Sequence, residues 1–304
     1  MTLWKRFKKK KRALHEQWRK FKKFVIIPFV KPLESKKDSP RYIVSLTSYG
    51  KRLKDVAPYA IITLLNQRVR PDKVVLWVGH KDKENISKTM KSLTKKGLEI
   101  RFCEDIRAYT KLLPALEMFP DDYIITADDD IYYPKNWLEK LLNKHKENPT
   151  KIICHRAHGI KVDKNNNLLP YCQWNNCNGQ TNLKNLFPTG VGGILYPPKC
   201  FHKDINNKEL FKKLAPFADD IWYWAMAIIN KEYFGEEYPH IVIENGYSIK
   251  LRNVDTSQEA NENALENYNV HQDGNDVQFK AVVEYYPQIK EALKKIEPTA
   301  ITKD

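Results

Sequence analysis

The chain has 304 residues, of which 42% are hydrophobic and 12% aromatic, and its formal net charge is +15. This is enough apolar material for one large folded domain, and it excludes a chain that is disordered over most of its length. Residues 1–37 carry +12 of the +15, from 14 Lys and Arg against two Glu. The body is therefore close to neutral, which argues against a uniformly basic nucleic-acid-binding domain, and we expect no nucleic-acid partner.

The N-terminal segment 4–25 carries large apolar residues at helical spacing: Trp4, Phe7, Leu14, Trp18, Phe21 and Val25. Lys and Arg fill most of the remaining positions. Aromatic residues on one face and cations on the other are typical of a helix lying in an anionic membrane interface. The alternatives are a solvated basic tail and a nucleic-acid-binding arm. We expect residues 1–39 to form a membrane-association arm and a linker, which Pro28 and Pro32 mark together with Pro40.

The composition also favours a cytoplasmic location. The apolar run FVIIPFV (24–30) is short, contains Pro28 and follows a long basic region, so it makes a poor signal peptide. No stretch approaches the roughly 18 apolar residues of a spanning helix. The five cysteines lack a CxxC pair, as expected for free thiols in a reducing compartment. We therefore expect a cytoplasmic protein, peripheral on the inner face of the cytoplasmic membrane.

The body, predicted over residues 40–296 with a tail at 297–304, alternates strand-like and helix-like runs. Strands are predicted over 41–48, 73–79, 98–102, 122–127 and 239–244, and helices over 56–67, 84–96, 110–119, 134–147, 218–230 and 277–294. This alternation predicts an α/β fold with a mostly parallel central sheet flanked by helices. Such open sheets bind ligands at the carboxyl ends of their strands. The chain has no GxGxxG after the first strand and no GxxxxGK[ST], so dinucleotide and P-loop folds are disfavoured.

Residues 123–134 read YIITADDDIYYP, an apolar run that ends in Asp128, Asp129 and Asp130. If the triplet is extended, Asp128 and Asp130 point to one side of the chain and Asp129 points to the other. Alternate carboxylates at a strand end can share a divalent cation, which relieves their repulsion. Hard oxygen ligands favour Mg²⁺ or Mn²⁺. The alternative is a solvated acidic loop.

A second acidic pair, Asp219 and Asp220, opens the helix predicted over 218–230. One of the two can cap the helix, which leaves the other free to act as a general base toward a sugar hydroxyl. In the alternative interpretation both serve only as cap and dipole partner.

Glycines and histidines add further candidates. The run GVGG (190–193) either lets the backbone approach a ligand closely or simply forms a tight turn. His271 lies in a polar loop, where it is either an imidazole ligand or a surface residue. For His155 and His158, on or beside another strand, a structural role is the favoured interpretation over contact with an acceptor or phosphate.

Taken in order, the segments VSLTSYGKRL, KLLP, ITADDDIYYP, HRAHGI, PTGVGGILYPP and ADDIWYW form a pattern. The pattern resembles bacterial glycosyltransferases with the GT-A fold, of the kind that build lipopolysaccharide or capsule. It is more distantly similar to family 2 and exostosin-like enzymes. The resemblance covers roughly residues 41–280, and the arm lies outside it.

The resemblance implies roles for individual residues. Asp130 would bind the metal and Asp128 the donor ribose or a metal-bound water, with Asp129 near the donor sugar. Asp220 would be the inverting base in preference to Asp219. Thr47, Tyr49 and Arg52 would contact the nucleotide, and Lys111 would face the donor. Gly192 and Gly193 would line the donor–acceptor junction. His271 would be a metal ligand.

These observations predict a metal-dependent glycosyltransferase. It would move a sugar from a nucleotide donor, UDP-linked by preference, to a growing lipid-linked or surface glycan with inversion, using Mn²⁺ or Mg²⁺. Its partners would be the nucleotide sugar, the acceptor and an anionic membrane surface bound through residues 4–25. The alternatives are a Mg²⁺-dependent nucleotidyl- or phosphotransferase and a catalytically silent glycan-binding protein.

Overall fold

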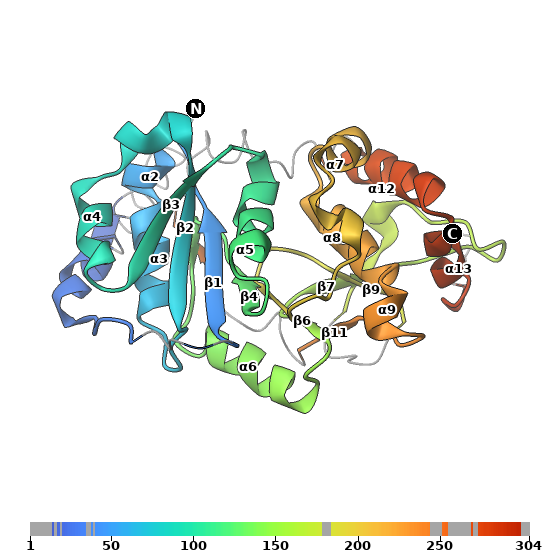
Figure 1. The fold of residues 1–304 in the computed structure, drawn as a ribbon, viewed down its shortest axis with the longest axis horizontal. Helices are drawn as coiled ribbons and strands as arrows, with labels where there is room; N and C mark the ends of the chain where they lie inside the picture. The colour runs from blue at the N-terminus through green and yellow to red at the C-terminus, as the bar shows by residue number, and fades with distance from the viewer. Residues whose placement is uncertain are drawn as a thin grey trace, which may run out of the picture.

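The computed structural model describes residues 14, 17–18, 20–34, 38, 40–177, 184–243, 251–254, 269 and 273–298. A seven-stranded sheet runs through the middle of the molecule (Figure 1), in the order β11-β6-β10-β4-β1-β2-β3. Its strands are β1 (Tyr42–Thr47), β2 (Lys73–Gly79), β3 (Leu98–Cys103), β4 (Tyr123–Thr126), β6 (Ile152–Cys154), β10 (Ile194–Tyr196) and β11 (His240–Val242). Strand β10 is antiparallel to both of its neighbours, and the other pairings are parallel.

Two smaller sheets flank the main one. Strand β5 (Ile131–Tyr132) pairs with β12 (Arg252–Asn253), immediately after the acidic triplet. Strand β7 (Ala157–Gly159) lies between β8 (Asn175–Asn176) and β9 (Leu186–Pro188).

Helices cover both faces of the main sheet (Figure 1). The α-helices are α2 (Arg52–Asp55), α3 (Ala57–Leu65), α4 (Lys88–Thr94), α5 (Leu113–Met118), α6 (Trp137–Glu147), α7 (Lys208–Leu214), α8 (Asp219–Ile228), α9 (Lys231–Phe234), α12 (Gly274–Tyr285) and α13 (Pro287–Leu293). Short 3₁₀ helices are η1 (Ile27–Phe29), η2 (His80–Asn85), η3 (Arg107–Lys111), η4 (Tyr171–Gln173) and η5 (Lys203–Asn206).

The central strands β1, β2 and β4 are mostly apolar because both faces of the sheet are buried there, whereas the edge strand β3 carries Glu99 and Arg101. In β2, Val74 and Leu76 pack with the cluster formed by α3, α4 and α6, whereas Val75 and Trp77 pack into the opposite cluster with α5 and α8. Successive side chains of a strand point to opposite faces, so a strand covered on both sides needs a continuous apolar run. The predicted GT-A fold, with a mostly parallel sheet between helices, is confirmed.

Several predicted boundaries differ from the structure. The helix expected over 110–119 is divided into η3 and α5, because Leu112, between them, leaves helical geometry. The helix expected over 277–294 is two helices, α12 and α13, because Pro287 has no N–H to continue the first. The structure of residues 299–304, most of the predicted tail, lies outside the description.

A buried ion pair joins the start of β1 to the start of β4. Asp122 is 2% exposed and accepts hydrogen bonds from the backbone N–H of Arg41 at 2.8 Å and from its Nη2 at 2.6 Å. The hydrogen bonds to Asp122 raise the pKa of Arg41, which burial alone would lower. This pair fixes the alignment of the two strands that carry the acidic edge.

We expect Asp122→Ala to lower the free energy of unfolding by about 3 kcal/mol, because it leaves the Arg41 guanidinium without its carboxylate partner. This is the lower end of the range for broken buried pairs, since the Arg41 side chain is 18% exposed. Asp121→Ala is the matched control, because Asp121 is 65% exposed and only touches Lys199. Its effect should stay within about 0.5 kcal/mol in denaturant titrations. Equal effects of the two substitutions would contradict this account of the pair.

Candidate active site

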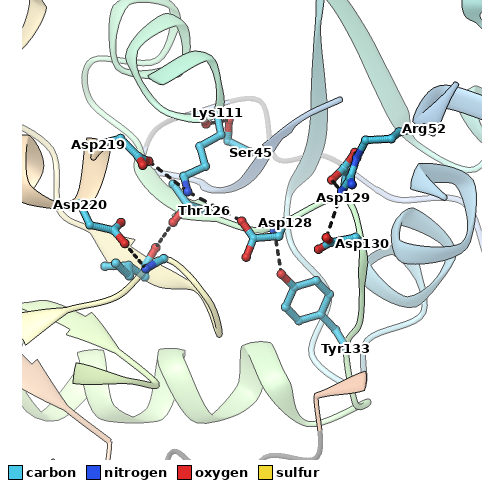
Figure 2. A network of polar contacts seen from close by, with 12 residues as sticks. Ser45, Arg52, Lys111, Thr126, Asp128, Asp129, Asp130, Tyr133, Asp219 and Asp220 are labelled. Atoms are coloured by element: carbon cyan, nitrogen blue, oxygen red, sulfur yellow. Dashed lines mark hydrogen bonds and ion pairs between the residues drawn. The ribbon is translucent and has the colours of Figure 1, made fainter. Parts of the chain in front are cut away.

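The two acidic clusters of the sequence meet at the carboxyl-terminal edge of the central strands (Figure 2). Strands β1 and β4 are parallel neighbours, so the residues that follow Thr47 and Thr126 emerge at the same edge. Asp128, Asp129 and Asp130 follow β4 directly. This is the position at which open α/β sheets bind their ligands.

Arg52 binds two of the three adjacent aspartates. Its Nε lies 2.9 Å from Oδ2 of Asp129, its Nη2 also bonds to Oδ1 of Asp129, and Nη2 lies 3.0 Å from Oδ2 of Asp130. Ser48 donates a 2.5 Å hydrogen bond to the same Oδ2 of Asp129. Burial alone would lower the pKa of Arg52, but the bonds to Asp129 and the charges of both carboxylates raise it above its ordinary value. Asp129 is thus a buried, fully bonded carboxylate.

Asp128 faces the other way, toward Lys111. The Lys111 Nζ lies 3.7 Å from Oδ1 of Asp128, and the backbone N–H of Asp128 donates to the Tyr133 hydroxyl at 2.7 Å. Burial raises the pKa of Asp128 to about 6, although Lys111 opposes the shift. Asp129 and Asp130 form a turn, so the condition for alternating side chains, an extended triplet, is not met. Asp130 binds Arg52 together with Asp129, whereas Asp128 faces Lys111.

Lys111 connects the two acidic clusters. Its Nζ lies 3.1 Å from Oδ2 of Asp219, on the far side from Asp128 (Figure 2). Its carbonyl accepts a 2.6 Å hydrogen bond from Ser45 in β1, whose hydroxyl accepts in turn from Trp77 at 2.9 Å. Burial would lower the pKa of Lys111, but the surrounding carboxylates raise it. One ammonium therefore stands between Asp128 of the acidic triplet and the aspartates of α8.

Asp220 is held by the backbone of the glycine-rich turn. The N–H of Gly190 donates to Oδ2 of Asp220 at 2.8 Å, while Oδ1 is buried and has no hydrogen-bond partner among the described residues. Burial and the charge of Asp219 raise the pKa of Asp220 to about 7, against the opposing charge of Lys111. A carboxyl group whose pKa is raised by burial and by a neighbouring charge is typical of a general acid or base.

The predicted helix cap is not formed by either aspartate. Ala218 is the N-cap residue of α8 and makes no side-chain cap bond, and both aspartates lie in the first turn. The positive end of the helix dipole favours negative charge at these positions. The two carboxylates are thereby left available to Lys111 and Gly190.

Gly190 is glycine because the site is crowded around it. A Cβ at this position would lie 2.9 Å from the Lys111 Nζ and 3.1 Å from Oδ1 of Asp220. The other two glycines that the sequence singled out pack elsewhere. A Cβ on Gly193 would lie 2.6 Å from the Trp137 ring, and one on Gly192 would touch His155 and Arg156. Within GVGG, Gly190 is the glycine that contacts the acidic clusters.

The remaining predicted residues lie around this centre. Thr47 donates to the Trp77 carbonyl at 3.0 Å, and Tyr49 is an exposed ring 5.9 Å from the Arg52 guanidinium carbon. His155 is fully buried with Nε2 3.1 Å from the Trp137 carbonyl, and burial lowers its pKa to about 3, which fits the structural role expected for it. His271 lies outside the described residues.

Sequence reasoning missed Ser48 and Gly190 as members of the site. Ser48 follows directly on β1, so its place at a strand end was a usable signal. Gly190 was visible only as part of a run, because its reason for being glycine is a contact with residues far away in sequence.

The triplet supplies hard oxygen donors of the kind that Mg²⁺ or Mn²⁺ prefers, while Asp128 and Asp130 point toward different cationic partners in this structure. Such ions are commonly held by one or two carboxylates, with substrate phosphates completing the shell. Asp128 and Asp130 are both partly exposed, and each now contacts a cationic side chain that a metal would have to displace. In the described part of the chain, no three His, Cys, Asp or Glu side chains gather closely enough to hold an ion without other ligands.

Comparison with known families bears on the chemistry. Residues 57–215, more than half of the chain, match the family described as Glycosyl transferase family 2. The chain is a family 2 glycosyltransferase. The match includes Lys111, the acidic triplet and Gly190, and it ends just before Asp219 and Asp220. No significantly similar sequence was found among curated proteins.

Several solved structures share parts of the chain path of this glycosyltransferase. One is 4-diphosphocytidyl-2C-methyl-D-erythritol synthase from Anaerococcus prevotii, at 15% identity and a TM-score of 0.46, covering 77% of this chain and 96% of that one. Another is TarS 1–349 from S. aureus in complex with UDP, at 13% identity and a TM-score of 0.44, covering 67% of this chain and 58% of that one. At these scores, neither likeness assigns a substrate.

Proposed function

We propose that this glycosyltransferase uses a nucleotide sugar, UDP-linked by preference, and that Asp220 is the base that activates the acceptor hydroxyl. The observation that carries the proposal is the state of Asp220: one oxygen is held by Gly190, and the other is buried without a hydrogen-bond partner among the described residues, on the side of Lys111 opposite Asp128. A sugar hydroxyl is a weak nucleophile, so a positioned carboxylate that accepts its proton accelerates attack by about 10²–10⁴-fold. A single direct displacement by the acceptor hydroxyl inverts the configuration at the anomeric carbon of the transferred sugar.

The donor would lie between the acidic triplet and Tyr49. Asp128 and Asp130 would hold Mn²⁺ or Mg²⁺, with His271 as a further candidate ligand. When bound, the ion supplies charge stabilisation for the leaving diphosphate. Arg52, released from Asp130, would be free to bind phosphate oxygens. Lys111, as a buried cation beside Asp219, would hold the α8 carboxylates in place.

The acceptor in this proposal is a lipid-linked glycan of the lipopolysaccharide or capsule type, and the enzyme works as a peripheral protein on the inner membrane surface. The strongly basic arm supports this proposal, because about 1 kcal/mol per cation attracts such segments to anionic lipid. In the described part of the chain, no helix has the length and apolarity to cross a bilayer.

Isothermal titration of the full-length protein with nucleotide sugars, with and without Mn²⁺, tests the donor proposal. We expect binding of a UDP-sugar that requires the metal, followed by slow metal-dependent hydrolysis of the donor. Preferential binding of nucleoside triphosphates would instead indicate a nucleotidyl- or phosphotransferase. Glycan binding that neither needs metal nor leads to turnover would indicate a silent binding protein.

A further inference from the structure

The segment after the basic arm is part of the folded body. Ile27 and Val30 are buried in the same cluster as α3 and α4, which joins them to the core. The backbone of this segment is bonded from the body as well: Arg70 Nη1 donates to the Pro32 carbonyl at 3.0 Å, and Lys96 Nζ donates to the Pro28 carbonyl at 3.0 Å. The linker predicted from the prolines is, over residues 26–34, held against the protein.

Leu33 shows how closely the segment fits. Its backbone N–H donates to the Lys96 carbonyl at 3.2 Å, and a Cβ on Gly97 would lie 2.6 Å from its side chain. Gly97 has φ +102°, so both its conformation and this contact require glycine. Residues 26–34 are therefore fixed to the end of the molecule formed by α3 and α4 (Figure 1).

Two cations of the helical turns described at residues 17–18 and 20–25 face the body. Lys20 Nζ lies 5.5 Å from the ring centre of Tyr59 in α3, and Lys23 Nζ lies 5.7 Å from that of Tyr132 in β5. Burial and the charge of Lys135 lower the pKa of Lys23. Since Tyr132 is two residues beyond Asp130, the arm reaches the strand that follows the acidic triplet.

The same turns present their aromatic rings to solvent. Trp18 and Phe21 stack on each other with ring centres 5.7 Å apart, and both are more than half exposed. Phe24 is 53% exposed and Phe29 80% exposed, next to the buried Ile27 and Val30. We define the aromatic face as Trp18, Phe21, Phe24 and Phe29. Several large exposed rings so close together in the chain are uncommon in a monomer and indicate an interaction site.

We propose that the aromatic face is the surface through which the enzyme inserts into an anionic lipid bilayer, and that its attachment to the body sets the orientation of the acidic edge relative to that bilayer. This inference deepens the proposed membrane association. It names the inserting residues, two of which, Phe24 and Phe29, fall outside the periodic stripe of the sequence. It also replaces a loose tether by a surface continuous with the catalytic body.

Charge complementarity selects lipid as the occupant. The first 37 residues carry +12, and a membrane with anionic headgroups offers both the negative charge and the apolar layer that the aromatic rings need. A nucleic acid would match the charge but would leave Phe29 without an apolar environment. A second copy of the chain would match the rings but would bring two strongly basic arms together.

Co-sedimentation of the full-length protein with phosphatidylcholine vesicles, with and without phosphatidylglycerol, tests the proposal. We expect binding to the anionic vesicles that weakens with salt. The variant carrying Trp18→Ser, Phe21→Ser, Phe24→Ser and Phe29→Ser should partition at least about a hundredfold less, because the transfer of several large rings is lost. The matched control is Val277→Ser with Tyr285→Ser, which removes exposed apolar side chains from α12 at the opposite end of the molecule. The control should bind as the unaltered protein does.

Other outcomes would overturn the proposal. Unchanged vesicle binding by the aromatic-face variant, at an unchanged melting temperature, would do so. The proposal would also be overturned if the unaltered protein were a dimer and the aromatic-face variant a monomer. The same holds if the variant lost RNA binding but kept vesicle binding. Hydrogen exchange of the unaltered protein needs no variant: vesicles should slow exchange in residues 20–30 and leave α12 and α13 unchanged. All these measurements omit donor and metal, so a failed donor assignment would not affect them.

Discussion

Asp220→Asn is expected to lower the rate of sugar transfer by about 10²–10⁴-fold while the protein stays folded. The amide keeps an oxygen that can accept the Gly190 N–H, so the local geometry should survive. It cannot accept the acceptor's proton. Donor binding should change little, because Asp220 contacts neither Asp128 nor Asp130 directly. Transfer by the variant at close to the normal rate would show that another group is the base.

The pH dependence separates this role from a structural one. With a pKa raised to about 7, Asp220 loses its proton near neutral pH, so turnover should fall about tenfold per pH unit below that value. The stability effect has the opposite direction. Because the folded-state pKa lies above the ordinary 3.8, this group stabilises the fold below about pH 4, and that stabilisation is lost as the pH rises through 7. Asp220→Asn should therefore be more stable than the unaltered protein at pH 8, by an amount that shrinks toward pH 4.

Substitution of Asp129 and of Asp130 by Asn, one at a time, should affect two different properties, stability and metal binding. Asp130→Asn is expected to weaken Mn²⁺ binding at least about tenfold and to stop transfer, because it removes a charged oxygen ligand. Its effect on unfolding should stay below about 1 kcal/mol, since Asp130 is partly exposed. Asp129→Asn should instead destabilise the fold by about 1.5–3 kcal/mol, because Asp129 is buried and bonded to Arg52 and Ser48.

Electron paramagnetic resonance of free Mn²⁺ and denaturant titration measure the two properties on the same samples. We expect Asp130→Asn to weaken metal binding and Asp129→Asn to lower the free energy of unfolding, and this difference is the test. If Asp129→Asn lost Mn²⁺ binding and Asp130→Asn kept it, the metal ligand would have been assigned to the wrong carboxylate.

The sequence was sufficient to predict most of the framework, because strands buried on both faces leave a strong signal. The run KVVLWVG was predicted as a strand over 73–79, and β2 occupies those same residues. The direction of β10 was not predictable, because three apolar residues after a glycine turn contain no information on pairing partners. The division of the last helix could have been foreseen from Pro287, which lacks the N–H that the previous turn needs.

The residues of the site were easier to find than their partners. Asp128 and Asp220 were identified from motifs, and the structure brings them to opposite sides of Lys111. The partners of these carboxylates come from other elements of the fold, such as Arg52 for Asp129, 77 positions away, and Gly190 for Asp220, 30 positions away. Asp130 points toward Arg52 because the chain turns at Asp129 and Asp130 instead of continuing as an extended segment. The local sequence is compatible with either conformation.

The charge balance around Arg52 and Lys111 has a kinetic consequence. Two cations stand among five aspartates, so the centre has a net negative charge when all the carboxylates are ionised. This charge would repel a nucleotide diphosphate. For the proposed nucleotide-sugar donor, binding without a cation would therefore be disfavoured, and a cation bound first or together with the diphosphate would cancel the repulsion. The order in which the substrates bind would then be dictated by the resting charge of the empty centre, with the metal ahead of the sugar nucleotide.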